Sequence, residues 1–166
     1  EWIHMLILFC GIPASGKTRI AREVAKEITH RRVIHVQSDI IRRLFPNPTY
    51  DPLENRIVYE AMNSLTELAL RSNYVVILDA TFLRQEWRER PLSIAEALGK
   101  KTLTVHVKCS VEAAIRRNKQ RTNPLSNELI KKFDEFFEEP VDALRIDSEK
   151  VSVQKAVEMI LGKATL

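Results

Sequence analysis

Long apolar runs and cysteine residues are both scarce in this chain of 166 residues. The run Ile3 to Cys10 is much shorter than the roughly 20 apolar residues that a membrane-spanning helix needs, and no other stretch approaches that length. A bilayer-spanning helix is therefore excluded. The two cysteines, Cys10 and Cys109, each end an apolar run that is typical of a buried strand. We expect reduced thiols in a cytoplasmic protein.

A strong net charge and a rich supply of aromatic residues are also missing. The formal charge is only +4, and local basic clusters are mostly solvated faces, so charge alone argues weakly for a nucleic-acid partner. Aromatic residues make up 7% of the chain, and they include no recognisable reader of bases. The side chains available for stacking on bases, each of which could instead lie in the core, are Phe45, Tyr50, Phe82 and Trp87.

Internal repeats and low-complexity segments are absent as well. A length of 166 residues leaves room for one domain of ordinary size, and no room for two. We therefore expect a single domain over residues 1–166. Nothing in the sequence indicates an oligomeric state.

The most specific motif that is present is the stretch Gly11 to Thr18, which fits G-x-x-x-x-G-K-S/T, the P-loop. Its glycines let the backbone curl around a phosphate with successive N–H groups pointing inward. Lys17 supplies a positive charge for the β and γ phosphates, and the hydroxyl of Thr18 binds Mg²⁺. An apolar run before the motif and a helical pattern after it favour a nucleoside triphosphate site over a plain glycine-containing turn. The residues expected to bind ATP are Gly11, Ala14, Ser15, Gly16, Lys17 and Thr18.

Strand and helix patterns alternate along the chain. Strands are expected at residues 3–10, 33–37, 74–79, 103–109 and 144–147. Helices are expected after the P-loop, after Ser38, over Leu53 to Leu70, from Pro91 as the first helical residue to Leu98, from Ser110 to Arg121, around residues 129–137 and over Ser152 to Leu161. This order predicts a three-layer α/β/α P-loop NTPase fold with a mainly parallel five-stranded sheet and a helical lid.

Two carboxylates directly follow predicted strands, where ligands bind in such a sheet. Asp79 ends an apolar strand, and we expect it to hold Mg²⁺ directly or through water; the alternatives are an N-cap or a buried partner for Thr81. Asp39 opens a helix and could simply cap it, but in the cleft it would accept the proton of an attacking hydroxyl. Arg42, one turn further along, would then bind a phosphate or carboxylate of the acceptor.

A basic cluster at Arg116, Arg117, Lys119 and Arg121 crowds like charges immediately before a chain break. Such segregation costs stability unless an anion is bound. We expect a lid at about residues 116–127 that closes over ATP and brings guanidinium groups to the transferring phosphate. The alternative is an ordinary basic surface helix.

Together these features resemble the P-loop kinases that include polynucleotide 5′-hydroxyl kinases and the kinase domain of L-seryl-tRNA(Sec) kinase. The resemblance covers nearly the whole chain. The segments that carry it are Gly11 to Thr18, Ser38 to Arg42, Leu78 to Thr81, Arg117 to Arg121 and Asn127 to Pro140. One departure is Phe82, which stands where the family usually has Asn after Asp-x-Thr.

The resemblance implies a role for each candidate residue. These roles are Lys17 and Thr18 on the triphosphate and Mg²⁺, Asp39 as general base, Arg42 on the acceptor, Asp79 near the metal, and Arg117 and Arg121 as catalytic lid arginines, with Arg117 also at the nucleotide. The leading hypothesis is an ATP- and Mg²⁺-dependent kinase that phosphorylates a hydroxyl carried by RNA, tRNA or a DNA 5′ end. The alternatives are an RNA-associated ATPase or assembly factor without an acceptor, and a small-metabolite kinase. No membrane partner is expected.

Overall fold

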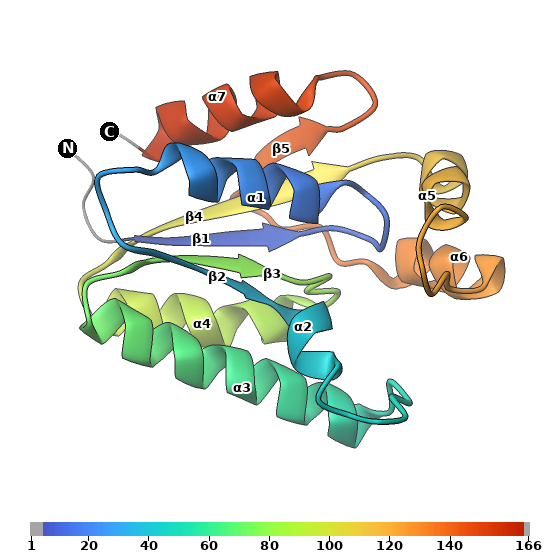
Figure 1. Ribbon diagram of the computed structural model, residues 1–166, viewed down its shortest axis with the longest axis horizontal. Helices are drawn as coiled ribbons and strands as arrows, with labels where there is room; N and C mark the ends of the chain where they lie inside the picture. The colour runs from blue at the N-terminus through green and yellow to red at the C-terminus, as the bar shows by residue number, and fades with distance from the viewer. Residues whose placement is uncertain (1–4, 165–166) are drawn as a thin grey trace.

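The structure is a computed structural model that describes residues 5–164. Its centre is a five-stranded sheet in the order β2-β3-β1-β4-β5, and every pair of neighbouring strands is parallel (Figure 1). The strands are β1 (Met5–Cys10), β2 (Val33–Gln37), β3 (Val75–Asp79), β4 (Lys101–Lys108) and β5 (Leu144–Asp147). The predicted α/β fold with a five-stranded parallel sheet is confirmed.

Helices cover both faces of the sheet. In Figure 1, α1 and α7 lie on one face, α3 and α4 lie on the other, and α5 and α6 lie beyond the carboxyl ends of the strands. The helices are α1 (Lys17–Glu27), α2 (Ser38–Arg42), α3 (Pro52–Arg71), α4 (Gln85–Ala97), α5 (Val111–Asn118), α6 (Asn127–Phe136) and α7 (Val153–Ala164). The expected strand residues Ile3 and His4 lie outside the described part of the chain.

The core has two halves, one on each side of β1. Successive side chains of a strand point to opposite faces. Met5, Ile7 and Phe9 therefore pack with α1 and α7, whereas Leu6, Leu8 and Cys10 pack with α3 and α4. Every residue of β1 is buried, as the unbroken apolar sequence predicts for a central parallel strand. Burial raises the pKa of the Cys10 thiol to about 11, and both cysteines are free.

Several helix boundaries differ from those expected, including the start of α4 and the end of α5. The helix α4 begins at Gln85, so Pro91 lies inside it rather than at its start. Proline interrupts only one helical hydrogen bond, and the preceding turn is retained because Trp87 and Arg88 are packed against other elements. The helix α5 ends at Asn118, before Arg121.

The early end of α5 has a local cause. The side chain of Asn118 is buried, its amide donates to the carbonyl of Leu125 (2.7 Å), and its oxygen accepts from the N–H of Leu125 (3.0 Å). These two bonds close the loop over residues 118–125, so Lys119 and Arg121 lie beyond the helix. Among residues 5–164, no helix combines the length and the apolar character needed to cross a bilayer.

Candidate active site

The P-loop joins β1 to α1 in the geometry that the motif requires. Ala14 and Gly16 have positive φ angles of 64° and 100°, and Gly16 is the N-cap of α1. At Gly11, a Cβ atom would collide with the carbonyl oxygen of Val107 and come within 2.9 Å of Ser15 Oγ. The backbone can take this path only with glycine at Gly11, and the path leaves the first turn of α1 open to an anion.

Two buried polar groups of the P-loop have few partners or none within the described residues 5–164. The Lys17 ammonium is buried and donates to the carbonyl of Ile12 (3.3 Å). Burial lowers the pKa of Lys17, while the nearby carboxylates of Asp79 and Asp39 act in the opposite direction. Ser15 Oγ is buried and has no hydrogen-bond partner among residues 5–164. A desolvated cation and an unsatisfied hydroxyl beside the free N–H groups of a helix fit a polyphosphate.

Asp79 ends β3 next to the P-loop. Its carboxylate is buried and lies 3.1 Å from Nε2 of His35, so its partner is His35 rather than Thr81. No cluster of three or more His, Cys, Asp or Glu side chains suited to a metal occurs within residues 5–164. A Mg²⁺ ion would therefore take its ligands mainly from phosphate oxygens and water, together with Thr18 and Asp79.

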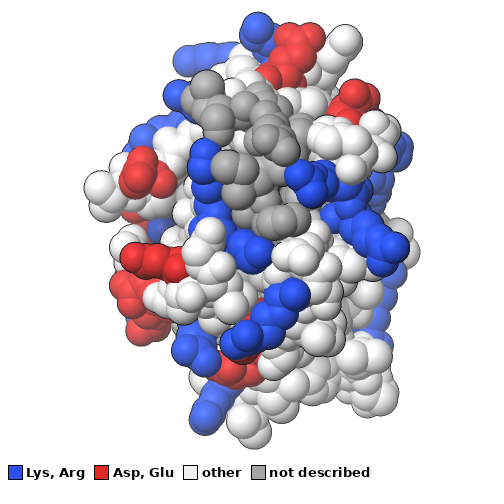
Figure 2. Space-filling view, turned by 90° about the vertical axis from the view of Figure 1, so that its left-hand side faces the viewer, with Lys and Arg blue, Asp and Glu red and all other residues white. Residues whose placement is uncertain are grey.

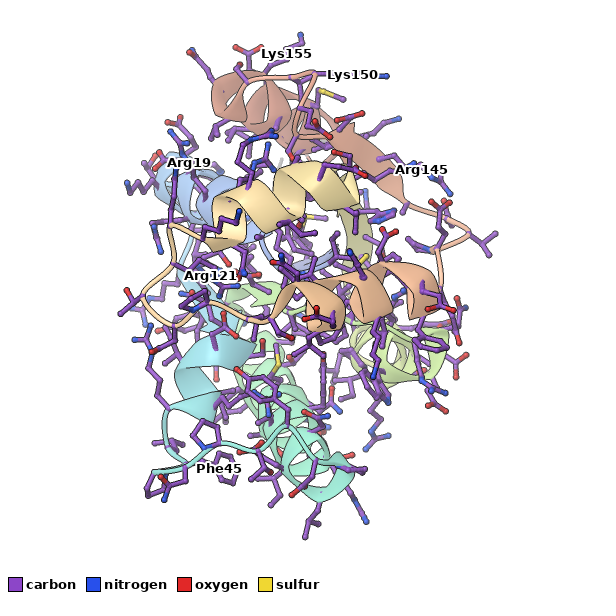
Figure 3. The ribbon with its side chains drawn as sticks, turned by 90° about the vertical axis from the view of Figure 1, so that its right-hand side faces the viewer. Arg19, Phe45, Arg121, Arg145, Lys150 and Lys155 are labelled. Atoms are coloured by element: carbon purple, nitrogen blue, oxygen red, sulfur yellow. The ribbon has the colours of Figure 1, made fainter. Side chains whose placement is uncertain are left out.

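Asp39 lies in the first turn of α2 and does not cap it. The N-cap is Gln37, and no side chain makes the capping hydrogen bond. The Asp39 carboxylate instead lies 3.3 Å from Nη2 of Arg121, which follows α5, and both side chains are partly exposed. Figure 3 shows Arg121 on the face formed by the carboxyl ends of the strands. The structure thus brings the Asp39 carboxylate and the Arg121 guanidinium together near Lys17.

Arg42 is buried and already has partners within the protein. Its guanidinium donates to Glu54 Oε2 (3.1 Å) and Asn55 Oδ1 (2.9 Å), and it lies 4.2 Å from the ring centroid of Tyr50. Glu54 also accepts from the N–H groups of Thr49 and Tyr50. The structure therefore gives Arg42 a part in ordering the loop before α3, and its contact with an acceptor stays a prediction.

Arg117 reaches from α5 to the back of the P-loop. Its Nη1 donates to the carbonyl of Ser15 (3.1 Å) and to Oγ of Ser148 (2.9 Å), and Ser148 Oγ also donates to the carbonyl of Ser15 (2.6 Å). Ser148, which follows β5, was not among the predicted site residues. A serine directly after a predicted strand was the available signal, because this end of the sheet carries the site.

Comparisons with known proteins identify the family of the chain. A family model described as AAA domain (AAA_33) matches residues 6–140. The L-seryl-tRNA(Sec) kinase of Methanococcus maripaludis is 27% identical over 138 residues, covering 82% of this chain and 53% of that protein. The KTI12 homolog of Xenopus laevis is 26% identical over 154 residues, covering 90% of this chain and 56% of that protein.

A solved structure shares the fold. The APS kinase CysC of Mycobacterium tuberculosis, in complex with AMPPNP and APS, matches with a TM-score of 0.78 and 15% identity, covering 98% of each chain. The chain spans about half the length of the curated relatives that it matches. Because the family model covers most of the sequence, the chain belongs to the AAA_33 family of P-loop domains.

Proposed function

We propose that this chain is an ATP- and Mg²⁺-dependent kinase that transfers the γ-phosphoryl group to a hydroxyl carried by RNA, as a tRNA-linked serine or a polynucleotide 5′ end. The observation that carries this proposal is the position of Asp39. Its carboxylate serves no cap, is partly exposed, and pairs with the lid residue Arg121 beside the P-loop lysine. A site built only to bind nucleotide needs no such carboxylate.

Each residue then has a defined part in the reaction. The P-loop N–H groups and Lys17 hold the β and γ phosphates, and Mg²⁺, when bound next to Thr18 and Asp79, neutralises charge on those phosphates. The acceptor oxygen bonds to the γ phosphorus while the bond from that phosphorus to the β–γ bridging oxygen breaks. The hydroxyl proton passes to Asp39, and ADP leaves. Arg121 stabilises the charge that spreads over the transferring group.

An RNA acceptor is supported by the charge of the site and by the similarity to an L-seryl-tRNA(Sec) kinase. Figure 3 places Arg19, Arg121 and Arg145 on the face where the strands end, and all three are exposed. The opposite face also carries Lys and Arg side chains, with Asp and Glu among them (Figure 2), so charge alone does not single out the site. A polyanion bound at the site should lose affinity steeply as salt rises.

The test is a phosphoryl-transfer screen with labelled ATP against 5′-hydroxyl oligonucleotides, seryl-tRNA and small metabolites. We expect label on an RNA-linked acceptor, with a strong salt dependence of acceptor binding. Asp39→Asn should abolish transfer, whereas Asp142→Asn, at an exposed position, should not. Transfer that is indifferent to salt and confined to small metabolites would contradict the RNA acceptor, and an active Asp39→Asn would contradict the base.

One observation favours a second candidate function. Phe82, which follows Asp-x-Thr, is 1% exposed and packs on Tyr59, so its side chain is placed to contribute to the core rather than to an acceptor site. An RNA-associated ATPase needs no acceptor contact at this position. It would hydrolyse ATP faster in the presence of a macromolecular partner and would yield no labelled product other than phosphate.

A further inference from the structure

The loop that follows β3 is held by contacts from several parts of the chain. The carbonyl of Thr81 accepts from the N–H of Gly11 in the P-loop (3.2 Å). The N–H of Phe82 donates to the hydroxyl of Tyr59 in α3 (3.2 Å), and Phe82 has a positive φ of 45°. This conformation is costly for a non-glycine residue and persists only where its surroundings fix it. The loop therefore joins the P-loop to helix α3.

The same loop is tied to the segment that follows α6, the helix directly after the predicted lid; residues 137–138 of this segment are called the lid anchor below. The N–H of Glu138 donates to the carbonyl of Leu83 (2.9 Å), and the Glu138 carboxylate accepts from the N–H of Gln85 (2.8 Å). Glu138 follows α6 by two residues. The lid anchor thus lies directly on the loop that also contacts the P-loop.

Arg88 lies at the centre of this junction. Its side chain is buried; Nε donates to the carbonyl of Phe82 (2.8 Å), and Nη2 donates to the carbonyls of Leu83 (3.3 Å) and Glu138. The guanidinium carbon lies 5.1 Å from the ring centroid of Phe137, which also belongs to the lid anchor. Within residues 5–164 the guanidinium forms no ion pair, and its Nη1 is buried without a partner.

Burying a guanidinium that is bonded only to carbonyls costs hydration free energy, so it contributes little to the stability of a fold. Charged groups lose hydration on burial, and apolar replacements of similar volume are often equally stable. The planar fork of arginine does, however, fix the directions of several carbonyls at once, which a lysine cannot do. The geometry of this junction is therefore better explained by positioning than by stability.

We propose that Arg88 is a positioning residue that couples the lid anchor to the P-loop, so that nucleotide bound at the P-loop orders the lid. The path runs from Gly11 to Thr81 and Phe82, then through Arg88 to Phe137 and Glu138. The proposal rests on the nucleotide site of the proposed function and does not depend on the identity, or the existence, of an acceptor.

The experiment measures how AMPPNP with Mg²⁺ protects the lid from trypsin, with mass spectrometry following cleavage at Arg116, Arg117, Lys119 and Arg121. Proteolysis requires local opening, so protection reports lid order. In the parent protein, saturating AMPPNP should slow cleavage at these sites by about tenfold. In Arg88→Met the slowing should fall below about twofold, while the AMPPNP affinity measured by calorimetry stays within about threefold of the parent. Arg90→Met, an exposed arginine of the same helix, is the matched control and should behave as the parent.

Arg88→Lys keeps the buried charge and provides a second variant if Arg88→Met does not fold. Its lid should be less protected from trypsin by AMPPNP, because an ammonium cannot reproduce the planar, multiple hydrogen bonding of a guanidinium. Full protection in either variant would overturn the proposal, as would a lid in the parent that AMPPNP leaves unprotected. Failure to find a labelled acceptor would contradict the proposed kinase activity without changing this measurement, because AMPPNP alone produces the protection.

Discussion

The Nη2 atom of Arg121 lies 3.3 Å from Oδ2 of Asp39, and this contact links the segment after α5 to the first turn of α2 across 82 positions of sequence. The two side chains are 39% and 57% exposed, so water screens the pair and its contribution to folding is small, at most about 1 kcal/mol. The contact with Arg121 nevertheless positions the carboxylate of Asp39, the proposed general base. A γ phosphate that attracts Arg121 would release the Asp39 carboxylate for the acceptor hydroxyl.

Arg121→Gln should separate activity from stability. We expect the rate of phosphoryl transfer, or of ATP hydrolysis if no acceptor exists, to fall by about 10²-fold or more, since the guanidinium stabilises the transferring charge. The melting temperature should change by no more than about 2 °C, because the ion pair is exposed. Lys132→Gln, an exposed cation on α6, is the control and should retain the parent rate. A parent-like rate in Arg121→Gln would show that this arginine does not take part in the reaction.

Asp79→Asn tests the metal. The amide keeps the size of the side chain and a hydrogen-bonding oxygen for His35 but removes the charge that attracts Mg²⁺. The Mg²⁺ concentration for half-maximal activity should rise by about 10- to 100-fold, and chelation of Mg²⁺ should abolish activity in the parent. A magnesium titration at fixed ATP measures both effects. An unchanged magnesium requirement would show that Asp79 has only a structural role, through its contact with His35.

Two glycine substitutions should have opposite effects on stability. In Gly11→Ala the new methyl group would meet the Val107 carbonyl and Ser15 Oγ, so we expect a loss of about 2 kcal/mol or more and weaker nucleotide binding. In Gly162→Ala the methyl group meets nothing within 4 Å on helix α7, and stability should rise by about 0.5–1 kcal/mol. Urea unfolding measures both. Equal destabilisation by the two substitutions would contradict the packing described for the P-loop.

Local sequence features predicted the strands and the P-loop because they depend on residues close together in the chain. The apolar run before Gly11 and the carboxylate that ends β3 identify a buried strand and its ligand-binding end without any knowledge of the sheet order. The predicted start of α4 at Pro91 was wrong because it, too, relied on local features alone. Proline is common at the first position of a helix, and only the tertiary packing of Trp87 and Arg88 shows that Pro91 lies within one.

Side-chain partners depended on long-range packing that no local pattern encodes. The pairing of His35 with Asp79 requires β2 and β3 to be neighbours with Gln37 opposite Asp79, which is a property of the sheet register. The buried contact of Arg42 with Glu54 likewise depends on how α2 meets α3. The local sequence therefore predicts which charged groups lie near the site, but not which of them bind each other.

His106 provides a further buried group whose titration should appear in the pH dependence of folding. It lies on β4 with a 5% exposed side chain, its ring stacks on Phe137 with centroids 4.7 Å apart, and its Nδ1 has no partner among residues 5–164. Burial lowers the pKa of His106 from 6.5 to about 4; the nearby Glu139 carboxylate opposes this shift, and Lys108 and Arg88 add to it. The folded protein thus keeps this imidazole neutral under mildly acidic conditions.

The sign of the effect follows from proton binding. Between pH 6.5 and pH 4 the unfolded chain binds a proton at His106 and the folded chain does not, so the free energy of unfolding falls as the pH falls through this window, by at most about 3 kcal/mol. His106→Phe keeps a ring against Phe137 and removes the titration, so its stability should fall less over the same window. Urea unfolding of the parent and of His106→Phe at pH 7 and at pH 4.5 measures the difference. Parallel pH profiles for the parent and His106→Phe would show that the imidazole is reached by water and titrates alike in both states.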